Sequence, residues 1–142
     1  MKWVVDASVA AKWLAPEAES DVAAALLDDE LLAPDLLFAE VANILWKKQL
    51  RAEMDAATAG AAVRWLGQAP LLVHDCGSLA SAALDLCNRL QHPAYDCFYL
   101  ALAQREGCAM ITADRRFVDR CNQPGSGTAG KVVLLSGVPG RR

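Results

Sequence analysis

Four carboxylates lie far apart in this sequence, and each stands beside an apolar segment. They are Asp6, Glu40, Asp96 and Asp114. An acid at the edge of a core is unfavourable unless something pairs with it, and acids that converge also repel one another. A divalent cation removes both penalties, because Mg²⁺ and Mn²⁺ take oxygen ligands. The four together predict a metal site, whereas any one alone is equally well explained as a helix cap or a solvated side chain.

Short apolar segments alternate with helical segments and predict the elements that position these acids. We expect strands over residues 2–5, 31–33, 71–73, 109–111 and 131–135. We expect helices over 8–14, 17–27, 35–50, 56–66, 78–90 and 94–106, with one or two turns over 114–121. Trp46 should face the core, the Gly- and Ser-rich stretch 123–130 should be a mobile loop, and about 136–142 should be a loose tail.

This alternation predicts an α/β fold in which a short, mainly parallel central sheet is flanked by helices, as one domain over residues 1–142. Ligands of such sheets bind outside the carboxyl ends of the strands. Asp6 and Asp114 directly follow predicted strands, Glu40 lies about one turn into a helix, and Asp96 lies near the start of another. The architecture can therefore bring all four carboxylates to one edge of the sheet.

Composition sets the broad class of the protein. The chain has 142 residues, 54% of them hydrophobic, and a net charge of -3, which excludes a generic polycation but leaves room for a local basic rim. Five cysteines without close pairing indicate reduced thiols in a cytosolic protein. We see no signal peptide and no apolar run near the ~20 residues that span a bilayer, so we expect a cytoplasmic protein without membrane contact.

Four segments carry a resemblance to a known family. They are Val4-Val5-Asp6-Ala7-Ser8, the stretch from Pro34 to Asn43, Tyr95-Asp96-Cys97-Phe98-Tyr99-Leu100-Ala101, and Ile111-Thr112-Ala113-Asp114-Arg115-Arg116-Phe117. In order and spacing they resemble the four motifs of PIN-domain nucleases, and above all the VapC toxins of bacterial and archaeal toxin–antitoxin pairs. The resemblance covers nearly the whole chain.

The resemblance implies a Mg²⁺- or Mn²⁺-dependent endoribonuclease that forms a homodimer and is held inactive by a cognate antitoxin. It implies structured RNA, such as tRNA or rRNA, as the substrate. The four acids would be the catalytic, metal-binding residues, supported by Ser8, Asn43 and Thr112. One departure is that acids are sparse after Asp114, where Asp119 is the candidate for an outer carboxylate.

The chemistry behind this reading is in-line hydrolysis of a phosphodiester by a metal-activated water. We expect Asp6 and Asp96 to be direct ligands, while Glu40 and Asp114 ligate directly, hold waters or orient the attacking water. The number of metal ions stays open.

The supporting residues have structural alternatives. Ser8 is better explained as a cap of the first helix than as a phosphate contact. Thr112 either bonds Asp6 or a metal-bound water, or simply ends a strand. Asn43 shares a helical face with Glu40, where a buried amide would need partners.

RNA requires positive charge near the acidic centre. Arg115 and Arg116 directly follow Asp114 and are the first candidates for phosphate contacts, and Lys12 is the second. The isolated His74 and His92 are treated as surface or turn residues.

Two other functions remain possible from the residues. One is an inert PIN-like scaffold that only binds a partner. The other, less favoured, is a Mg²⁺-binding phosphate-receiver domain. It would use Asp75 as phosphoacceptor and require paired acids after the first strand and a lysine at the end of the last strand, whereas only Asp6 follows the first strand and Lys131 begins the last one.

Overall fold

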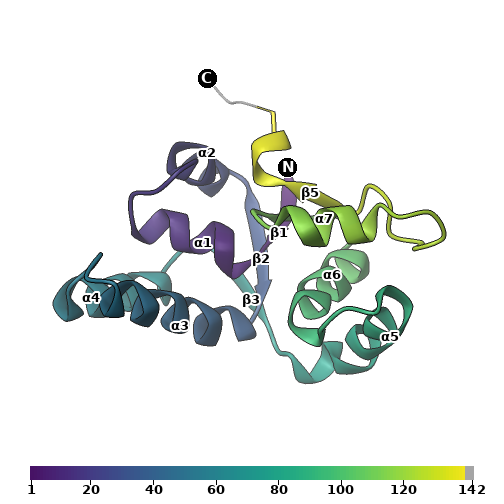
Figure 1. Cartoon of the computed structure of the whole chain (residues 1–142), viewed down its shortest axis with the longest axis horizontal. Helices are drawn as coiled ribbons and strands as arrows, with labels where there is room; N and C mark the ends of the chain where they lie inside the picture. The colour runs from purple at the N-terminus through teal and green to yellow at the C-terminus, as the bar shows by residue number, and fades with distance from the viewer. Residues whose placement is uncertain (140–142) are drawn as a thin grey trace.

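The structure, a computed structural model, describes residues 1–139 and has a five-stranded, all-parallel sheet surrounded by helices (Figure 1). The strands are β1 (Lys2–Val5), β2 (Glu30–Pro34), β3 (Leu72–His74), β4 (Ala109–Thr112) and β5 (Val132–Leu134). Their order in the sheet is β3-β2-β1-β4-β5. The predicted α/β class with a parallel sheet is therefore confirmed.

The helices follow the sequence pattern closely. They are α1 (Ala7–Leu14), α2 (Ser20–Ala25), α3 (Leu36–Leu50), α4 (Ala56–Leu66), α5 (Ala80–Leu90), α6 (Ala94–Glu106) and α7 (Arg115–Cys121). In the view of Figure 1, α1 to α4 lie to the left of the sheet and α5 to α7 to the right. Local signals fix several ends: the Asp55 carboxylate caps α4 by accepting from Thr58 N at 2.7 Å, and α6 ends at Gly107 with φ +67°.

Both faces of the sheet are buried, as the apolar strands require. Alternate residues of neighbouring strands enter two separate hydrophobic clusters. Val4, Leu32 and Met110 belong to the larger cluster, with residues of α3, α5 and α6. Trp3, Leu31 and Ile111 belong to the smaller one, together with Leu135 and Val138. Strand β1 lies at the centre of the sheet, so Asp6, which follows it, lies between the ends of β2 and β4.

Some expectations are wrong, and the reasons are local contacts. Helix α2 begins at Ser20 and not at Glu17, because Glu19 adopts the left-handed conformation with φ 68°, which cannot be part of a right-handed helix. The Glu17 carboxylate pairs with Lys12 and Lys48 at 3.2 and 2.8 Å. Trp46 is 54% exposed and does not face the core.

The C-terminal segments are more ordered than expected. The hydroxyls of Ser126 and Thr128 are buried and both donate to the carbonyl oxygen of Cys121, at 2.6 and 2.8 Å, which anchors the loop over 123–130. Residues 135–137 form a 3-10 turn and Val138 packs in the smaller cluster, so the expected tail is not loose as far as Val138. Its last residues, 140–142, lie outside the described part of the chain.

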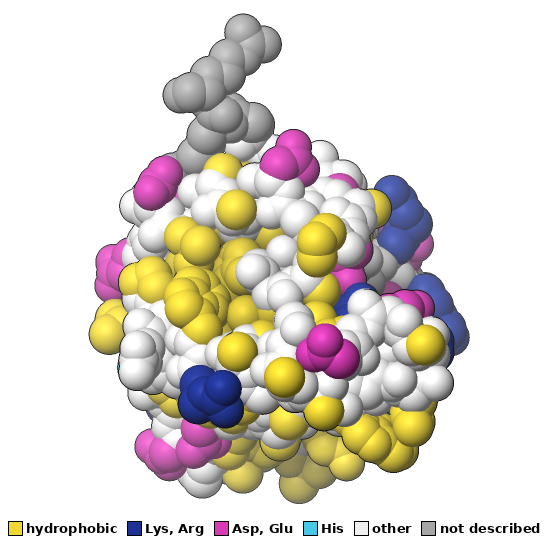
Figure 2. Space-filling model, turned by 90° about the vertical axis from the view of Figure 1, so that its left-hand side faces the viewer, with side chains coloured by type: hydrophobic (Ala, Val, Ile, Leu, Met, Phe, Trp, Pro, Cys, Tyr) yellow, Lys and Arg dark blue, Asp and Glu magenta, His cyan; other side chains and the backbone are white. Residues whose placement is uncertain are grey.

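The face formed around α1, α2 and α4 shows a hollow lined with hydrophobic side chains and bordered by charged ones (Figure 2). Elsewhere, Leu72 and Val73 on the edge strand β3 are 55% and 42% exposed. Large exposed apolar surfaces of this kind mark interaction sites in soluble proteins. All five cysteines are free thiols. Within residues 1–139, none of the helices combines the length and hydrophobicity needed to cross a bilayer.

Candidate active site

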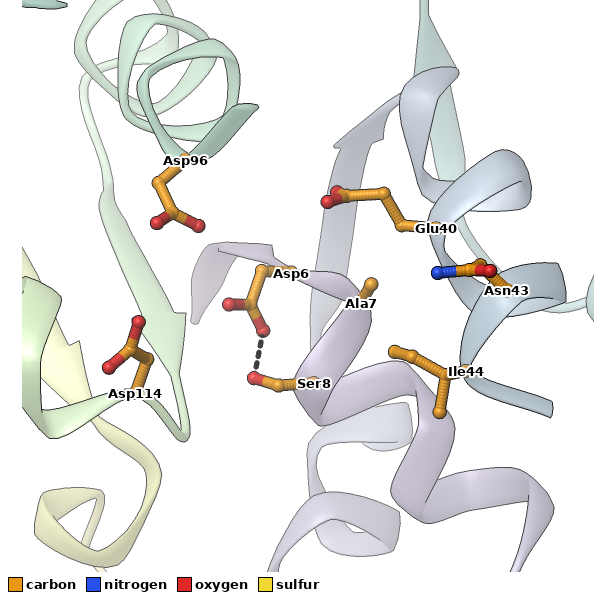
Figure 3. A pocket seen from close by; sticks show the side chains of 8 residues that line it. All are labelled: Asp6, Ala7, Ser8, Glu40, Asn43, Ile44, Asp96 and Asp114. Carbon is orange, nitrogen blue, oxygen red and sulfur yellow. Dashed lines mark hydrogen bonds between the residues drawn. The ribbon is translucent and has the colours of Figure 1, made fainter. Parts of the chain in front are cut away.

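The four carboxylates line one cavity of about 240 Å³ at the carboxyl edge of the sheet (Figure 3). Asp6 follows β1 and caps α1, and Asp114 follows β4 and caps α7. Glu40 lies in α3 and Asp96 in the first turn of α6. The chain leaves β1 towards β2 on one side, while β4 lies on the other side, so the cavity opens where the strand order changes direction. Such switch points are where parallel α/β sheets bind ligands.

Asp6 is the most constrained of the four, at only 5% exposed. Its Oδ1 accepts hydrogen bonds from Ser8 Oγ at 2.6 Å and from Val9 N at 3.1 Å. Its Oδ2 accepts from Thr112 Oγ1 at 2.5 Å. Burial raises the pKa of the Asp6 carboxyl to about 6 although these bonds favour the charged form, and the nearby Asp96 adds to the increase. All three donors favour the charged carboxylate, but together they do not offset the cost of burying it.

Glu40 is held from the core side. Tyr99, which is 1% exposed, donates its hydroxyl hydrogen to Glu40 Oε1 at 2.7 Å. Burial raises the pKa of Glu40, the Tyr99 bond opposes that increase, and the charge of Asp96 reinforces it. The second oxygen of Glu40 is not engaged by Tyr99, and the carboxylate points into the cavity in Figure 3. Tyr99 was missed as a site residue because its position in α6 identifies it equally well as a core residue.

His92, which was expected to be an isolated surface or turn residue, orients Asp96. His92 Nε2 lies 2.7 Å from Asp96 Oδ2, and the His92 ring packs on Phe117 with the ring centroids 4.6 Å apart. The spacing of four residues is the one signal that could have suggested this pair. It was obscured because Pro93 separates His92 from α6, which begins only at Ala94.

Asp114 is the N-cap of α7. Its Oδ1 accepts from Arg116 N at 3.0 Å and from Phe117 N at 3.4 Å, while its own backbone N–H donates to Thr112 Oγ1 at 3.0 Å. These bonds hold Oδ1 at the helix end, and Figure 3 shows the side chain directed towards Asp6 and Asp96.

The predicted supporting residues differ in what they contact. Ser8 is not the cap of α1, because Asp6 fills that position. Instead Ser8 Oγ donates to Asp6 and accepts from Ala113 N at 3.0 Å, and thereby joins α1 to the loop after β4. Asn43 lies on the cavity wall but is exposed and not buried.

The residues predicted to contact RNA differ in their surroundings. Arg115 and Arg116 are both exposed, and Arg116 lines a second cavity beside the first. Lys12 donates to Glu17 Oε1 at 3.2 Å and to the carbonyl of Ala18 at 2.7 Å, and it lines neither cavity. The Lys12 ammonium group is therefore already engaged within the protein. Asp119 is exposed on α7 and is not part of either cavity wall.

The receiver-domain alternative loses its support in this arrangement. Asp75 follows the edge strand β3, is exposed, and caps a 3-10 turn by accepting from Ser78 N at 2.9 Å. It does not line the carboxylate cavity. Lys131 precedes β5 and is exposed.

The donor set suits a hard divalent cation. The carboxylates supply only oxygen ligands. Burial is the main cause of the raised pKa values of Asp6 and Glu40, and the charge of Asp96 adds to it; a bound cation would offset both effects. Within residues 1–139, no three His, Cys, Asp or Glu side chains are close enough together to enclose one ion directly.

Comparisons with known proteins match most of the chain. A family model described as PIN domain matches residues 3–122. The chain is 34% identical over 124 residues to Ribonuclease VapC3 of Pyrobaculum aerophilum, covering 84% of this chain and 95% of that protein. Among solved structures, PAE2754 of the same organism aligns with a TM-score of 0.71 at 20% identity, over 96% of this chain and 85% of the other. A toxin–antitoxin complex from Klebsiella pneumoniae aligns with a TM-score of 0.59 at 12% identity, over 93% and 96%.

Proposed function

The chain belongs to the PIN domain family, and from this membership we propose that it is a divalent-metal-dependent endoribonuclease and the toxin of a toxin–antitoxin pair. The observation that carries the proposal is the cavity in which Asp6, Glu40, Asp96 and Asp114 converge, with Asp6 buried among donors that favour its charged form. The 34% identity to a protein named as a ribonuclease supports the same reaction class.

In the proposed mechanism the carboxylates of Asp6 and Asp96 would hold Mg²⁺ or Mn²⁺. A divalent ion bound there would supply an activated water and neutralise charge on the phosphate. Ser8 and Thr112 keep the Asp6 carboxylate in one orientation, and His92 does the same for Asp96. These contacts mean that the ligands need little rearrangement when the ion binds.

Glu40 and Asp114 have the complementary task of orienting water. Because Tyr99 engages only Oε1 of Glu40, Oε2 can accept a hydrogen bond or a proton from the attacking water. The raised pKa of Glu40 brings this carboxylate closer to the range in which a general base works well. Asp114 sits across the cavity, where it can hold a second water or contact the ion.

The proposed substrate is RNA, and structured RNA such as tRNA or rRNA is the class that the family resemblance implies. The exposed Arg115 and Arg116 lie at the start of α7, next to Asp114, and can neutralise phosphates that approach the acidic centre. With a net charge of -3, attraction to RNA must come from this local rim and the bound cation, not from the protein as a whole.

The proposed protein partners are a cognate antitoxin and a second copy of the chain. Support for the antitoxin comes from the aligned Klebsiella pneumoniae structure, which is a toxin–antitoxin complex, and from the hydrophobic hollow in Figure 2. Co-expression with the product of an adjacent small reading frame tests this point: we expect co-purification and relief of toxicity. Light scattering on the purified chain tests for the homodimer.

The deciding experiment compares wild type with Asp6→Asn after brief expression, by sequencing the new RNA ends. Wild type should generate ends at a defined site, and Asp6→Asn should not. With purified protein, EDTA should stop cleavage and added Mg²⁺ or Mn²⁺ should restore it. Cleavage that is indifferent to chelation would exclude the metal mechanism, and absence of new ends in wild type would exclude the nuclease.

A further inference from the structure

A second cavity, of about 620 Å³, opens beside the carboxylate cavity and shares three of its lining residues. Glu40, Asp96 and Asp114 line both. The other walls of this second cavity come from the turn between α5 and α6, from the start of α6 and from α7; they are Gln91, His92, Pro93, Tyr95, Arg116 and Arg120. Its size lies within the range of cavities that bind small organic ligands. It continues directly from the proposed reaction centre, so a molecule bound at the centre would extend into it.

Two side chains on these walls are free to contact such a molecule. Tyr95 is 63% exposed, which is unusual for a large aromatic side chain, and Arg116 is exposed on the facing helix α7. An aromatic face and a guanidinium group beside a site for phosphate chemistry are the pair of groups that proteins use for unpaired nucleotides. The aromatic ring stacks on the base, and the cation pairs with the phosphate.

The remaining walls are fixed in place. Arg120 donates to the carbonyl of Leu90 and to the side chain of Gln123, which ties α7 to the end of α5. Gln91 adopts the left-handed conformation with φ 51°, and the His92 ring packs on the fully buried Phe117. The cavity is therefore formed before any ligand arrives, so binding does not have to order its walls.

We propose that this cavity receives one unpaired nucleotide next to the cleaved phosphodiester, with its base stacked on Tyr95 and its phosphate paired with Arg116. The inference rests on the proposed ribonuclease function and adds a requirement to it. A base inside a duplex is already stacked on both faces and cannot present one to Tyr95. The enzyme would accordingly cut RNA at loops, bulges or single-stranded segments, and it would discriminate against paired ones at this cavity.

The test uses a short single-stranded RNA that spans the cleavage site mapped by end sequencing, with 2-aminopurine next to the scissile phosphate. Binding is followed in the Asp6→Asn background with Mg²⁺ present, so that the RNA stays intact. Stacking on Tyr95 should quench the 2-aminopurine emission. Tyr95→Phe should retain the quenching and bind within about twofold, whereas Tyr95→Ala should lose it and bind about 5- to 150-fold more weakly.

Matched controls separate stacking from general surface effects. Trp46→Ala removes an aromatic side chain of similar exposure, 54%, that lines neither cavity, and it should leave binding unchanged. Arg116→Ala should reduce the slope of log K against log salt concentration by about 0.7, as expected for the loss of one phosphate contact on a single strand. Arg64 is an exposed cation on α4, and Arg64→Ala should leave this slope unchanged.

The outcomes distinguish this inference from the function on which it rests. If wild type cleaves RNA but Tyr95→Ala binds and quenches like Tyr95→Phe, the nucleotide cavity is refuted and the nuclease stands. If a hairpin carrying 2-aminopurine in its stem binds and quenches as well as the single strand, the requirement for an unpaired base is refuted. If wild type shows no metal-dependent cleavage, the function itself fails, and the cavity assignment fails with it.

Discussion

Thr112 Oγ1 donates a 2.5 Å hydrogen bond to Oδ2 of Asp6, across 106 positions of sequence. The same hydroxyl oxygen accepts the backbone N–H of Asp114 at 3.0 Å. One buried side chain at the end of β4 therefore fixes the orientation of the carboxylate after β1 and the start of the loop that carries Asp114. The two central strands are joined at the proposed reaction centre by this contact.

Replacing Thr112 with valine should weaken metal binding. Valine keeps the shape but removes the donor to Asp6, so the carboxylate loses one of its three hydrogen bonds and part of its fixed orientation. We expect Mn²⁺ affinity to fall by roughly 10- to 100-fold and unfolding free energy to fall by about 1–3 kcal/mol. Isothermal titration and urea unfolding measure the two. Thr112→Ser keeps the hydroxyl and should behave nearly as wild type; equal Mn²⁺ affinity in the valine and serine variants would contradict the positioning role.

Replacing Asp6 with asparagine should abolish cleavage while stabilising the metal-free fold. The side-chain oxygen of asparagine can still accept from Ser8 and Val9, and only the contact to Thr112 must be rearranged. Removing a buried charge at neutral pH should raise the unfolding free energy by about 1–3 kcal/mol. Cleavage should fall by roughly 100-fold or more, because the metal site loses a ligand. Full activity in this variant would refute the role of Asp6.

The pH dependence of stability should carry the signature of the same carboxyl. Its pKa is about 6 in the folded protein against an ordinary value of 3.8, so the folded state binds the proton more tightly. Between these pH values the folded state holds more protons than the unfolded state, and stability falls as pH rises. In EDTA, the unfolding free energy of wild type should fall by about 2 kcal/mol relative to Asp6→Asn between pH 4 and pH 7. A constant difference across this range in urea titrations would contradict the assignment.

Tyr99→Phe tests the role of Glu40. The tyrosine hydroxyl favours the charged form of Glu40, so its removal should raise the pKa of Glu40 further. If Glu40 accepts a proton from water, the acidic limb of the kcat/KM profile should move to higher pH. Stability should change by only about 1 kcal/mol, because the ring is kept. Tyr95→Phe is the matched control and should leave the profile unmoved; an unmoved profile in Tyr99→Phe would exclude Glu40 as the base.

The fold was predictable because its signals are local. The apolar strands, the Asp55 cap and the terminating Gly107 each act through neighbouring residues. The four carboxylates were predictable by type and position, since parallel strands bring their carboxyl ends to one edge. The start of α2 was not predictable, because it is set by the left-handed backbone of Glu19, a conformation that a glutamate seldom adopts.

The finer structure of the site depends on side-chain directions that no periodicity encodes. The His92–Asp96 contact requires the turn at Pro93, and the role of Ser8 follows from Asp6 capping the helix in its place. Trp46 has the helical spacing of a core residue but is exposed. Helical spacing therefore does not distinguish buried from exposed apolar residues on α3. Lys12 has the right distance from Ser8 along the chain, yet its ammonium group is already bound by Glu17 and Ala18.

The bond between Thr112 and Asp6 also bears on when the protein becomes active. Asp6 leaves the ribosome more than a hundred residues before β4 and Asp114 do. Until then β1 lacks one of its two neighbours in the sheet, and the four carboxylates are not yet brought together. The proposed reaction centre therefore cannot assemble while this stretch of the chain is still being synthesised.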